Sequence, residues 1–292
     1  MKRLFVSFLF SLVTGSLPAE EFRPNLGPDL PAITVSVGEV TLLLRRESQW
    51  TPGRIDFRGT PLSTERSAYG TVFNFPGVGF VGTGHLENEP ENLQSLRFFF
   101  NGSALESPQE SLEGTSFRLE RSSLIREIGL ENTIRLENGK LYETAKVRSP
   151  YETPLKLVYH FMHAWVPSVS GYVAGVDATG EEFSEKLTDD DSAHRQFHLR
   201  RPIDWIAVYE PGSRKFAVSR LLAAPPELKT TSKLWNVVGT YRKYYLESAL
   251  NETLPAGFHG TWSMVTAFGE GEPETWQEEA RKLAIELASE EK

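Results

Sequence analysis

Short runs of alternating apolar and polar residues, separated by turn residues, recur along most of this chain and restrict it to an antiparallel β architecture. The clearest case is Asn138-Gly139, which stands between the alternating runs 132–137 and 141–147. Asn-Gly between two such runs is the strongest short hairpin signal in a sequence, because both residues tolerate the positive φ of a type I′ turn. Gly38-Glu39, between the apolar runs 33–37 and 40–44, predicts a second compact hairpin.

Further strand signals continue to the C-terminal region, where the periodicity changes. Strands are expected near 55–57, 96–100, 116–121, 124–128, 155–165, 171–177, 203–209, 215–221, 235–246 and 261–267. The stretch 69–85 has too many glycines for a regular strand interior, so bulges or close backbone approach are expected there. The tail, about residues 273–290, has one apolar face at helical spacing, formed by Trp276, Ala280, Leu283 and Leu287. The expected fold class is therefore all-β: a large antiparallel β-sandwich with a C-terminal amphipathic helix.

The N-terminal residues have the three regions of a secretory signal. Lys2 and Arg3 precede an apolar run that ends near Ala19, and this run is too short to span a bilayer. We expect residues 1–19 to be a signal peptide and residues 20–292 to be one β-sandwich domain, secreted or periplasmic and without membrane insertion after signal removal. The chain has no cysteine, which leaves no disulfide framework and no lipidation site behind the signal.

The charge balance excludes some partners. The formal net charge is −8, and loss of Lys2 and Arg3 with the signal would bring it to −10. This balance does not favour nucleic acid or anionic lipid. A polyanionic polysaccharide would be an awkward ligand unless arginines cluster locally. The sequence gives no prediction of oligomeric state.

Residues 154–177 contain the most informative polar side chain. On a regular strand, Leu155, Leu157, Tyr159, Phe161 and His163 share one face, and His160 lies on the other. His163 then ends an apolar row next to Trp165, where Pro167 and Ser168 turn the strand into a loop. A titratable group at the mouth of an aromatic sheet suits a sugar site. The alternative is a histidine that caps the core and is hydrogen-bonded there.

Several kinds of site find no support in the sequence. There is no Gly-x-Ser-x-Gly elbow, His-Glu-x-x-His motif or dinucleotide fingerprint. His160 and His163, on opposite faces of a strand, would chelate one metal poorly. The acidic segment 179–195 reads as a solvated excursion with a helical turn and lacks the order of a calcium loop. We expect no metal and no cofactor, which leaves acid–base chemistry by histidine and carboxylate.

The order of several short motifs resembles the galactose mutarotase-like, or aldose 1-epimerase-like, superfamily. These motifs are Gly84-His85, Pro154-Leu155, His163-Ala164-Trp165, Gly175-Val176-Asp177, Tyr245-Leu246-Glu247 and Leu254-Pro255-Ala256-Gly257. The resemblance implies a β-supersandwich, with His163 as general acid, His85 as a second histidine near the ring oxygen and Glu247 as base. It also implies that Asp177 contacts a sugar hydroxyl, and that Asn74 stands where the family has an asparagine-arginine pair.

Glu247 has a separate argument from its neighbours. Tyr241, Lys243, Tyr245 and Glu247 share one face of a strand, so rings that cover sugar C–H groups stand beside a carboxylate. We expect His85, His163 and Glu247 to be catalytic, with Asn74, Trp165, Asp177 and Tyr245 binding substrate.

Structural alternatives remain open for these residues. Glu247 would pair with Lys243, His85 would be a loop histidine held by backbone, Asp177 would form a turn and Trp165 would fill the core. The function expected is that of an exported carbohydrate-active or carbohydrate-binding protein. If it is an enzyme, it is an isomerase acting at the anomeric centre of a sugar, with a lyase or glycosidase accessory role less favoured. The alternative is a non-catalytic glycan-binding or envelope-associated module that binds a sugar or polysaccharide.

Overall fold

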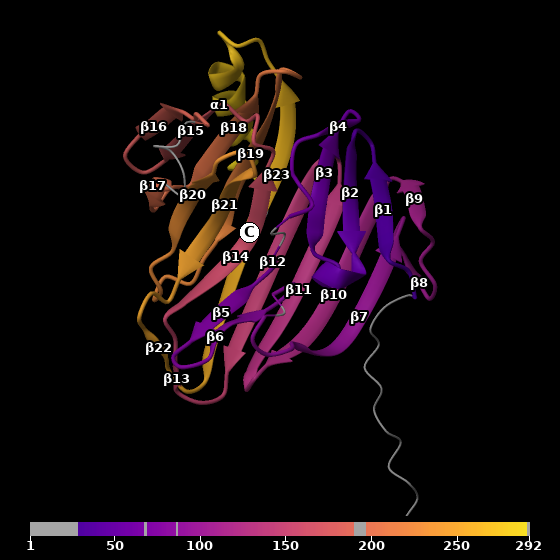
Figure 1. Cartoon of the computed structure of the whole chain (residues 1–292), viewed down its shortest axis with the longest axis vertical. Coiled ribbons are helices and arrows are strands. Elements are labelled where there is room, and N and C mark those ends of the chain that lie inside the picture. Colours follow the sequence, from indigo (N-terminus) through magenta and orange to yellow (C-terminus); the bar gives the residue numbers. More distant parts are fainter. Residues whose placement is uncertain (1–28, 67–68, 86, 190–196, 291–292) are drawn as a thin grey trace, which may run out of the picture.

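A large antiparallel sheet forms one layer of the molecule, and two smaller sheets lie side by side over it (Figure 1). The structure is a computed structural model that describes residues 29–66, 69–85, 87–189 and 197–290. The predicted signal peptide, residues 1–19, lies outside the described residues. The predicted all-β sandwich is confirmed.

The large sheet has the strand order β16-β15-β18-β19-β23-β12-β11-β10-β7-β8. Asn138-Gly139 forms the turn between β11 and β12 with positive φ at both residues, as predicted. The strands are β7 (Asn92–Phe100), β8 (Ser103–Leu105), β10 (Ser116–Ile125), β11 (Ile128–Glu137), β12 (Lys140–Ser149), β15 (Gly171–Val176), β16 (Glu181–Lys186), β18 (Trp205–Glu210), β19 (Lys215–Ala223) and β23 (Phe258–Glu270).

A five-stranded sheet covers one part of the large sheet, in the order β4-β3-β2-β1-β9. Gly38-Glu39 makes the predicted turn between β1 and β2, and β9 pairs with β1 in parallel. A 3-10 turn, Arg46–Ser48, follows β2. The strands are β1 (Ala32–Val37), β2 (Val40–Arg45), β3 (Pro52–Phe57), β4 (Thr60–Pro61) and β9 (Ser111–Gly114).

A six-stranded sheet, which carries most of the predicted site residues, has the order β17-β20-β21-β14-β5-β6. One face packs on the core, and the other is called the outer face below. The strands are β5 (Val72–Phe75), β6 (Gly79–Gly82), β14 (Leu157–Trp165), β17 (Phe197–Arg201), β20 (Thr231–Val237) and β21 (Tyr241–Ser248). The short strands β13 (Thr153–Pro154) and β22 (Thr253–Leu254) pair beside it.

Strand β14 contains a β-bulge that changes which residues face the core. Tyr159 and His160 oppose Glu247 and Leu246 of β21, but His163 opposes Tyr244. Two residues of β14, Phe161 and Met162, therefore face a single residue of β21, and the alternation shifts by one. Phe161 takes a left-handed φ of 53°, and the backbone N–H groups of both bulged residues donate to carbonyls of residues 69 and 70.

The helix α1 (Trp276–Leu287) covers the far side of the large sheet (Figure 1). Its predicted apolar residues pack there: Trp276, Ala280 and Leu287 are buried, and Leu283 is partly buried. A separate and larger hydrophobic cluster joins the large sheet to both smaller sheets. The amphipathic pattern of the tail thus correctly predicts a helix that closes the sandwich.

The acidic segment 179–195 differs from its prediction. Glu181–Lys186 forms the edge strand β16, paired with β15, where a solvated excursion with a helical turn was expected. Its side chains are mostly exposed, which is the pattern of an edge strand with charges on it. Residues 190–196 lie outside the described part of the chain.

Candidate functional site

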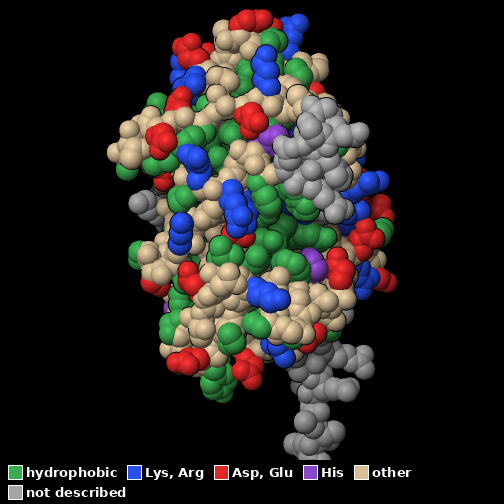
Figure 2. Space-filling view, turned by 60° about the vertical axis from the view of Figure 1, so that its left-hand side comes forward, with side chains coloured by type: hydrophobic (Ala, Val, Ile, Leu, Met, Phe, Trp, Pro, Cys, Tyr) green, Lys and Arg blue, Asp and Glu red, His purple; other side chains and the backbone are tan. Residues whose placement is uncertain are grey.

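The outer face of the six-stranded sheet carries a continuous row of aromatic rings. The ring of Phe80 stacks on Tyr159 at a centroid distance of 5.4 Å, and Tyr159 meets Tyr245 at 4.7 Å. This aromatic row (Phe80, Tyr159, Tyr245) spans β6, β14 and β21 because those strands bring their outward residues into register. Figure 2, which turns this side of the molecule forward, shows hydrophobic side chains gathered with basic and acidic groups around them.

Glu247 lies beside the aromatic row, directly opposite Tyr159 and two residues after Tyr245 on β21. Its side chain is 2% exposed and contacts the ammonium group of Lys233 on β20. The partner of Glu247 is therefore Lys233 on the neighbouring strand, in place of the expected Lys243 on β21 itself. A depression of about 490 Å³ opens beside the carboxylate; this Glu247 depression is lined by Arg200, Arg201, Pro202, Lys229, Thr231, Glu247, Leu250 and Glu252.

The two tyrosines of the row stay protonated at neutral pH. Burial, followed by the charge of Glu247, raises the pKa of the Tyr159 phenol. Burial also raises the pKa of Tyr245, whose hydroxyl is hydrogen-bonded to that of Tyr159. Neutral phenols offer both a donor and an acceptor. The row therefore combines flat apolar faces with hydroxyl groups of fixed protonation state.

His85 lies at the Phe80 end of the row. Its ring is 5.4 Å from that of Phe80 and 5.0 Å from that of Tyr69, and its Nδ1 atom lies 2.5 Å from a carboxylate oxygen of Glu87. Burial lowers the pKa of His85, the charge of Lys243 lowers it further, and Glu87 opposes both. His85 and Glu247 thus belong to one face, with the rings of Phe80 and Tyr159 between them.

Lys243 sits beside the row in an aromatic cage. Its ammonium lies 5.2 Å from the ring centre of Tyr69, 5.6 Å from Trp235 and 5.1 Å from Tyr241. Cation–π contacts of this kind stabilise a cation that has left water. Burial nevertheless lowers the pKa of Lys243 to about 8.

His163 does not share this face, and the predicted alternation from Tyr159 to His163 is wrong. Because of the bulge, His163 points with His160 into the interior between the sheets. Its Nε2 atom lies 2.7 Å from Oε2 of Glu143 on β12 of the large sheet. His160 is also buried, hydrogen-bonded to Ser248 and stacked on Trp262 at 4.2 Å. The sheet itself separates His163 from Glu247.

The remaining predicted residues divide between the outer face and other places. Asn74 pairs with Phe80 across β5 and β6, and its buried Oδ1 atom has no hydrogen-bond partner within the described chain. Trp165 is 1% exposed and belongs to the core, so it does not line the outer face. Asp177 follows β15 in the large sheet, where it contacts Arg220 and its N–H donates to Asp204. Asn74 and Tyr245 therefore remain candidates for ligand contact.

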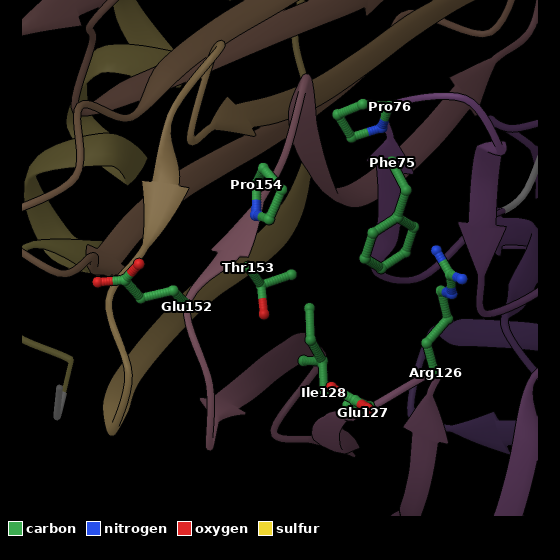
Figure 3. A pocket seen from close by; sticks show the side chains of 8 residues that line it. All are labelled: Phe75, Pro76, Arg126, Glu127, Ile128, Glu152, Thr153 and Pro154. Atoms are coloured by element: carbon green, nitrogen blue, oxygen red, sulfur yellow. The ribbon is translucent and has the colours of Figure 1, made fainter.

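A second depression of about 320 Å³ lies where the turns after β5 and β10 approach β13 (Figure 3). Phe75 and Arg126 lie next to each other on one side, with the guanidinium carbon 5.3 Å from the ring centre. Thr153 and Pro154 form the opposite side. None of the predicted site residues lines this depression.

Metal clusters and membrane-spanning helices are both absent from the described residues. Across these ranges, no three histidine or carboxylate side chains gather closely enough to hold a metal ion. No helix in the same ranges has the length and apolar character needed to cross a membrane.

Comparison with known proteins gives likenesses in structure. No family model and no curated protein sequence matches the chain. A galactose mutarotase-like protein from Lactobacillus casei is similar at 10% identity and a TM-score of 0.49, covering 82% of this chain and all of that one. A putative aldose 1-epimerase from Escherichia coli K12 is similar at 12% identity and a TM-score of 0.43, covering 82% and 99%.

A heparan sulfate lyase from Pedobacter heparinus is similar at 6% identity and a TM-score of 0.44, over 80% of this chain and a third of the lyase. Each of these likenesses is one of fold. The chemistry of the site follows from the residues described above.

Sequence reasoning missed Phe80, Lys233, Trp235 and Arg200 as members of this face. The periodicity of β21 correctly places Tyr241, Lys243, Tyr245 and Glu247 together, because that strand has no bulge. Which residues of other strands oppose them depends on pairing between distant segments. The available signal was the aromatic content of residues 69–80, which was interpreted as backbone irregularity because of its glycines.

Proposed function

We propose that this protein is a non-catalytic carbohydrate-binding protein that holds a sugar on the outer face of the six-stranded sheet. One observation carries the proposal: a row of three rings lies beside a buried carboxylate–ammonium pair and an open depression. Sugars present apolar C–H faces and a rim of hydroxyls, and an aromatic surface with fixed polar groups matches both.

The polar groups of the face are suited to hydroxyl recognition. Glu247 is held by Lys233, so its free lone pairs accept hydrogen bonds in a fixed direction. The phenols of Tyr159 and Tyr245 and the amide of Asn74 add donors and acceptors along the row. Groups fixed by neighbours before binding lose less entropy when the ligand arrives.

Catalysis at the anomeric centre is less well supported. Such a reaction needs an acid and a base on either side of one sugar ring, each within hydrogen-bond reach directly or through one water. His163 faces the interior, and the rings of Phe80 and Tyr159 stand between His85 and Glu247. Freshly dissolved α-glucose and α-galactose, followed by NMR, should equilibrate at the spontaneous rate with the protein present. Faster equilibration that Glu247→Gln abolishes would instead assign the face to an epimerase.

Binding is tested directly with a glycan array and calorimetry on the mature chain. Tyr159→Ala should weaken the affinity for any glycan bound by the parent protein at least tenfold, because the stacking of the ring on the sugar and a hydroxyl contact are both lost. Tyr151→Ala is the matched control, because Tyr151 is 61% exposed in the turn between β12 and β13 and is not part of the row. Equal losses in both variants, or no glycan bound by the parent protein, would contradict the proposal.

We also propose that the protein acts after export. The basic start and apolar run of residues 1–19 support this. Expression in a bacterial host and mass spectrometry of the exported protein should find a new N-terminus near Glu20. An intact Met1 in exported material would contradict the assignment.

A further inference from the structure

The Glu247 depression is rich in positive charge, although the chain as a whole carries −8. Arg200, Arg201 and Lys229 line it, and Lys233 stands behind Glu247. These four cations face two carboxylates, Glu247 and Glu252. The local balance is therefore opposite in sign to that of the whole molecule, which is the arginine clustering that an acidic sugar would require.

Two of the cations are available to a ligand. Lys233 forms an ion pair with Glu247. Arg201 forms an ion pair with Glu181 at 3.7 Å and a cation–π contact with the ring of Phe183. Within the described residues, neither Arg200 nor Lys229 has a carboxylate at ion-pair distance. Both side chains are exposed at the depression, so an incoming anion meets them without first breaking an ion pair in that part of the chain.

Arg200 is also close to the ring-binding part of the site. Its guanidinium carbon is 5.8 Å from the ring centre of Phe197, which stacks on Trp235 and is 46% exposed. The charge of Arg200 acts on Tyr159 and Tyr245 of the aromatic row. A cation thus stands where a substituent of a sugar lying on the rings would project.

We propose that the ligand is an acidic saccharide whose anionic group, a carboxylate, phosphate ester or sulfate ester, is bound in the Glu247 depression by Arg200 and Lys229. This inference rests on the proposed carbohydrate-binding function and specifies the class of sugar. Arginine binds planar carboxylate and tetrahedral oxyanions through paired N–H donors, and lysine adds a point charge. The aromatic row holds the sugar ring, and Glu247 accepts from a hydroxyl.

The test compares four probes by calorimetry: methyl β-glucoside, methyl β-glucuronide, glucose 6-phosphate and glucose 6-sulfate. At least one acidic probe should bind about tenfold or more tightly than the neutral glucoside, as expected for a charge-assisted hydrogen bond. That preference should shrink as salt is raised. The relative order of the acidic probes identifies which anion the depression accepts.

Variants locate the effect. Arg200→Gln and Lys229→Gln together should remove the preference for the acidic probe and leave the affinity for the neutral glucoside within about twofold. The matched control is Arg148→Gln with Lys146→Gln, two exposed cations of β12 on the large sheet whose replacement removes the same two charges, and it should keep the preference. Loss of the preference in the control to the same degree would overturn the assignment to the depression.

The failures of the two proposals are distinguishable. Equal binding of neutral and acidic probes overturns the acidic-sugar inference and leaves carbohydrate binding standing. An acidic preference that survives the Arg200 and Lys229 changes overturns the site. Absence of binding by all four probes, together with a blank glycan array, overturns both.

Discussion

The Nε2 atom of His163 lies 2.7 Å from the Oε2 atom of Glu143, across the interior between the six-stranded and ten-stranded sheets. Both side chains are buried. A buried pair of this kind ties the two layers to one another, and removing one member leaves the other without its partner.

His163→Ala should therefore lower the free energy of unfolding by about 3–5 kcal/mol, because it leaves a buried carboxyl unpaired. Chemical denaturation measures this loss. Glycan binding by the folded fraction should persist, since His163 lies on the other side of the sheet from Glu247. His163→Gln, which keeps a hydrogen-bond donor, should recover part of the stability. Normal stability combined with lost glycan binding would contradict the interior role.

Trp165→Ala should also destabilise the protein, because the indole fills the core. The expected loss is about 3–5 kcal/mol, with a melting temperature lower by several degrees. Trp235 on the outer face is the matched control, since it is only partly buried and stacks on Phe197. Trp235→Ala should cost less stability and weaken glycan binding. The opposite ranking would return Trp165 to the ligand site.

His160 should make stability fall with acid. Burial lowers its pKa to about 3, whereas an unfolded histidine titrates near 6.5. Between these values the unfolded chain binds a proton that the native chain excludes, so the free energy of unfolding falls as pH falls, by up to about 1.4 kcal/mol per unit. His160→Gln should flatten this slope in denaturation series from pH 7 to 4. Comparison with His259→Gln, at an exposed position, shows how much of the slope depends on burial.

Lys243 should act on stability in the alkaline range. Its native pKa of about 8 lies below the ordinary lysine value, so between about pH 8 and 10.5 the native state has lost a proton that the unfolded state keeps. The free energy of unfolding should therefore gain a rising contribution with pH across this window. Lys243→Met should abolish that contribution in denaturation at pH 7.5 and 9.5. An unchanged difference between the two pH values would show that the cage keeps Lys243 charged.

Local sequence rules predicted the parts of the fold that depend on neighbouring residues. Asn138-Gly139 determines a turn by its own φ preferences, and the period of Trp276, Ala280 and Leu287 determines a helix face. The face of β21 was correct for the same reason, because alternation holds wherever the ladder is regular. These elements needed no information about distant partners.

The candidate site depended on relationships that alternation does not contain. The position of His163 was wrong because β14 bulges at Phe161 and Met162, and the bulge depends on backbone hydrogen bonds to residues 69 and 70. The predicted partner of Glu247, Lys243, was wrong because the actual partner, Lys233, comes from another strand. Asp177 was assigned to a sugar contact, but its partners Arg220 and Asp204 lie far from it in sequence.

The bulge divides β14 into two parts that should differ in their tolerance to substitution. Before it, partly exposed residues such as Tyr159 alternate with buried ones such as His160, and the partly exposed positions should change more freely. Residues after it, such as His163 and Trp165, are buried in the interior and should tolerate few replacements. Deletion of a single bulged residue would restore regular alternation, so that His163 and Trp165 would turn to the outer face. The residues before the bulge would keep their orientation. Saturation mutagenesis along the strand should accordingly show tolerance with a step at Phe161, and homologous chains should gain or lose the histidine in concert with the length of this segment.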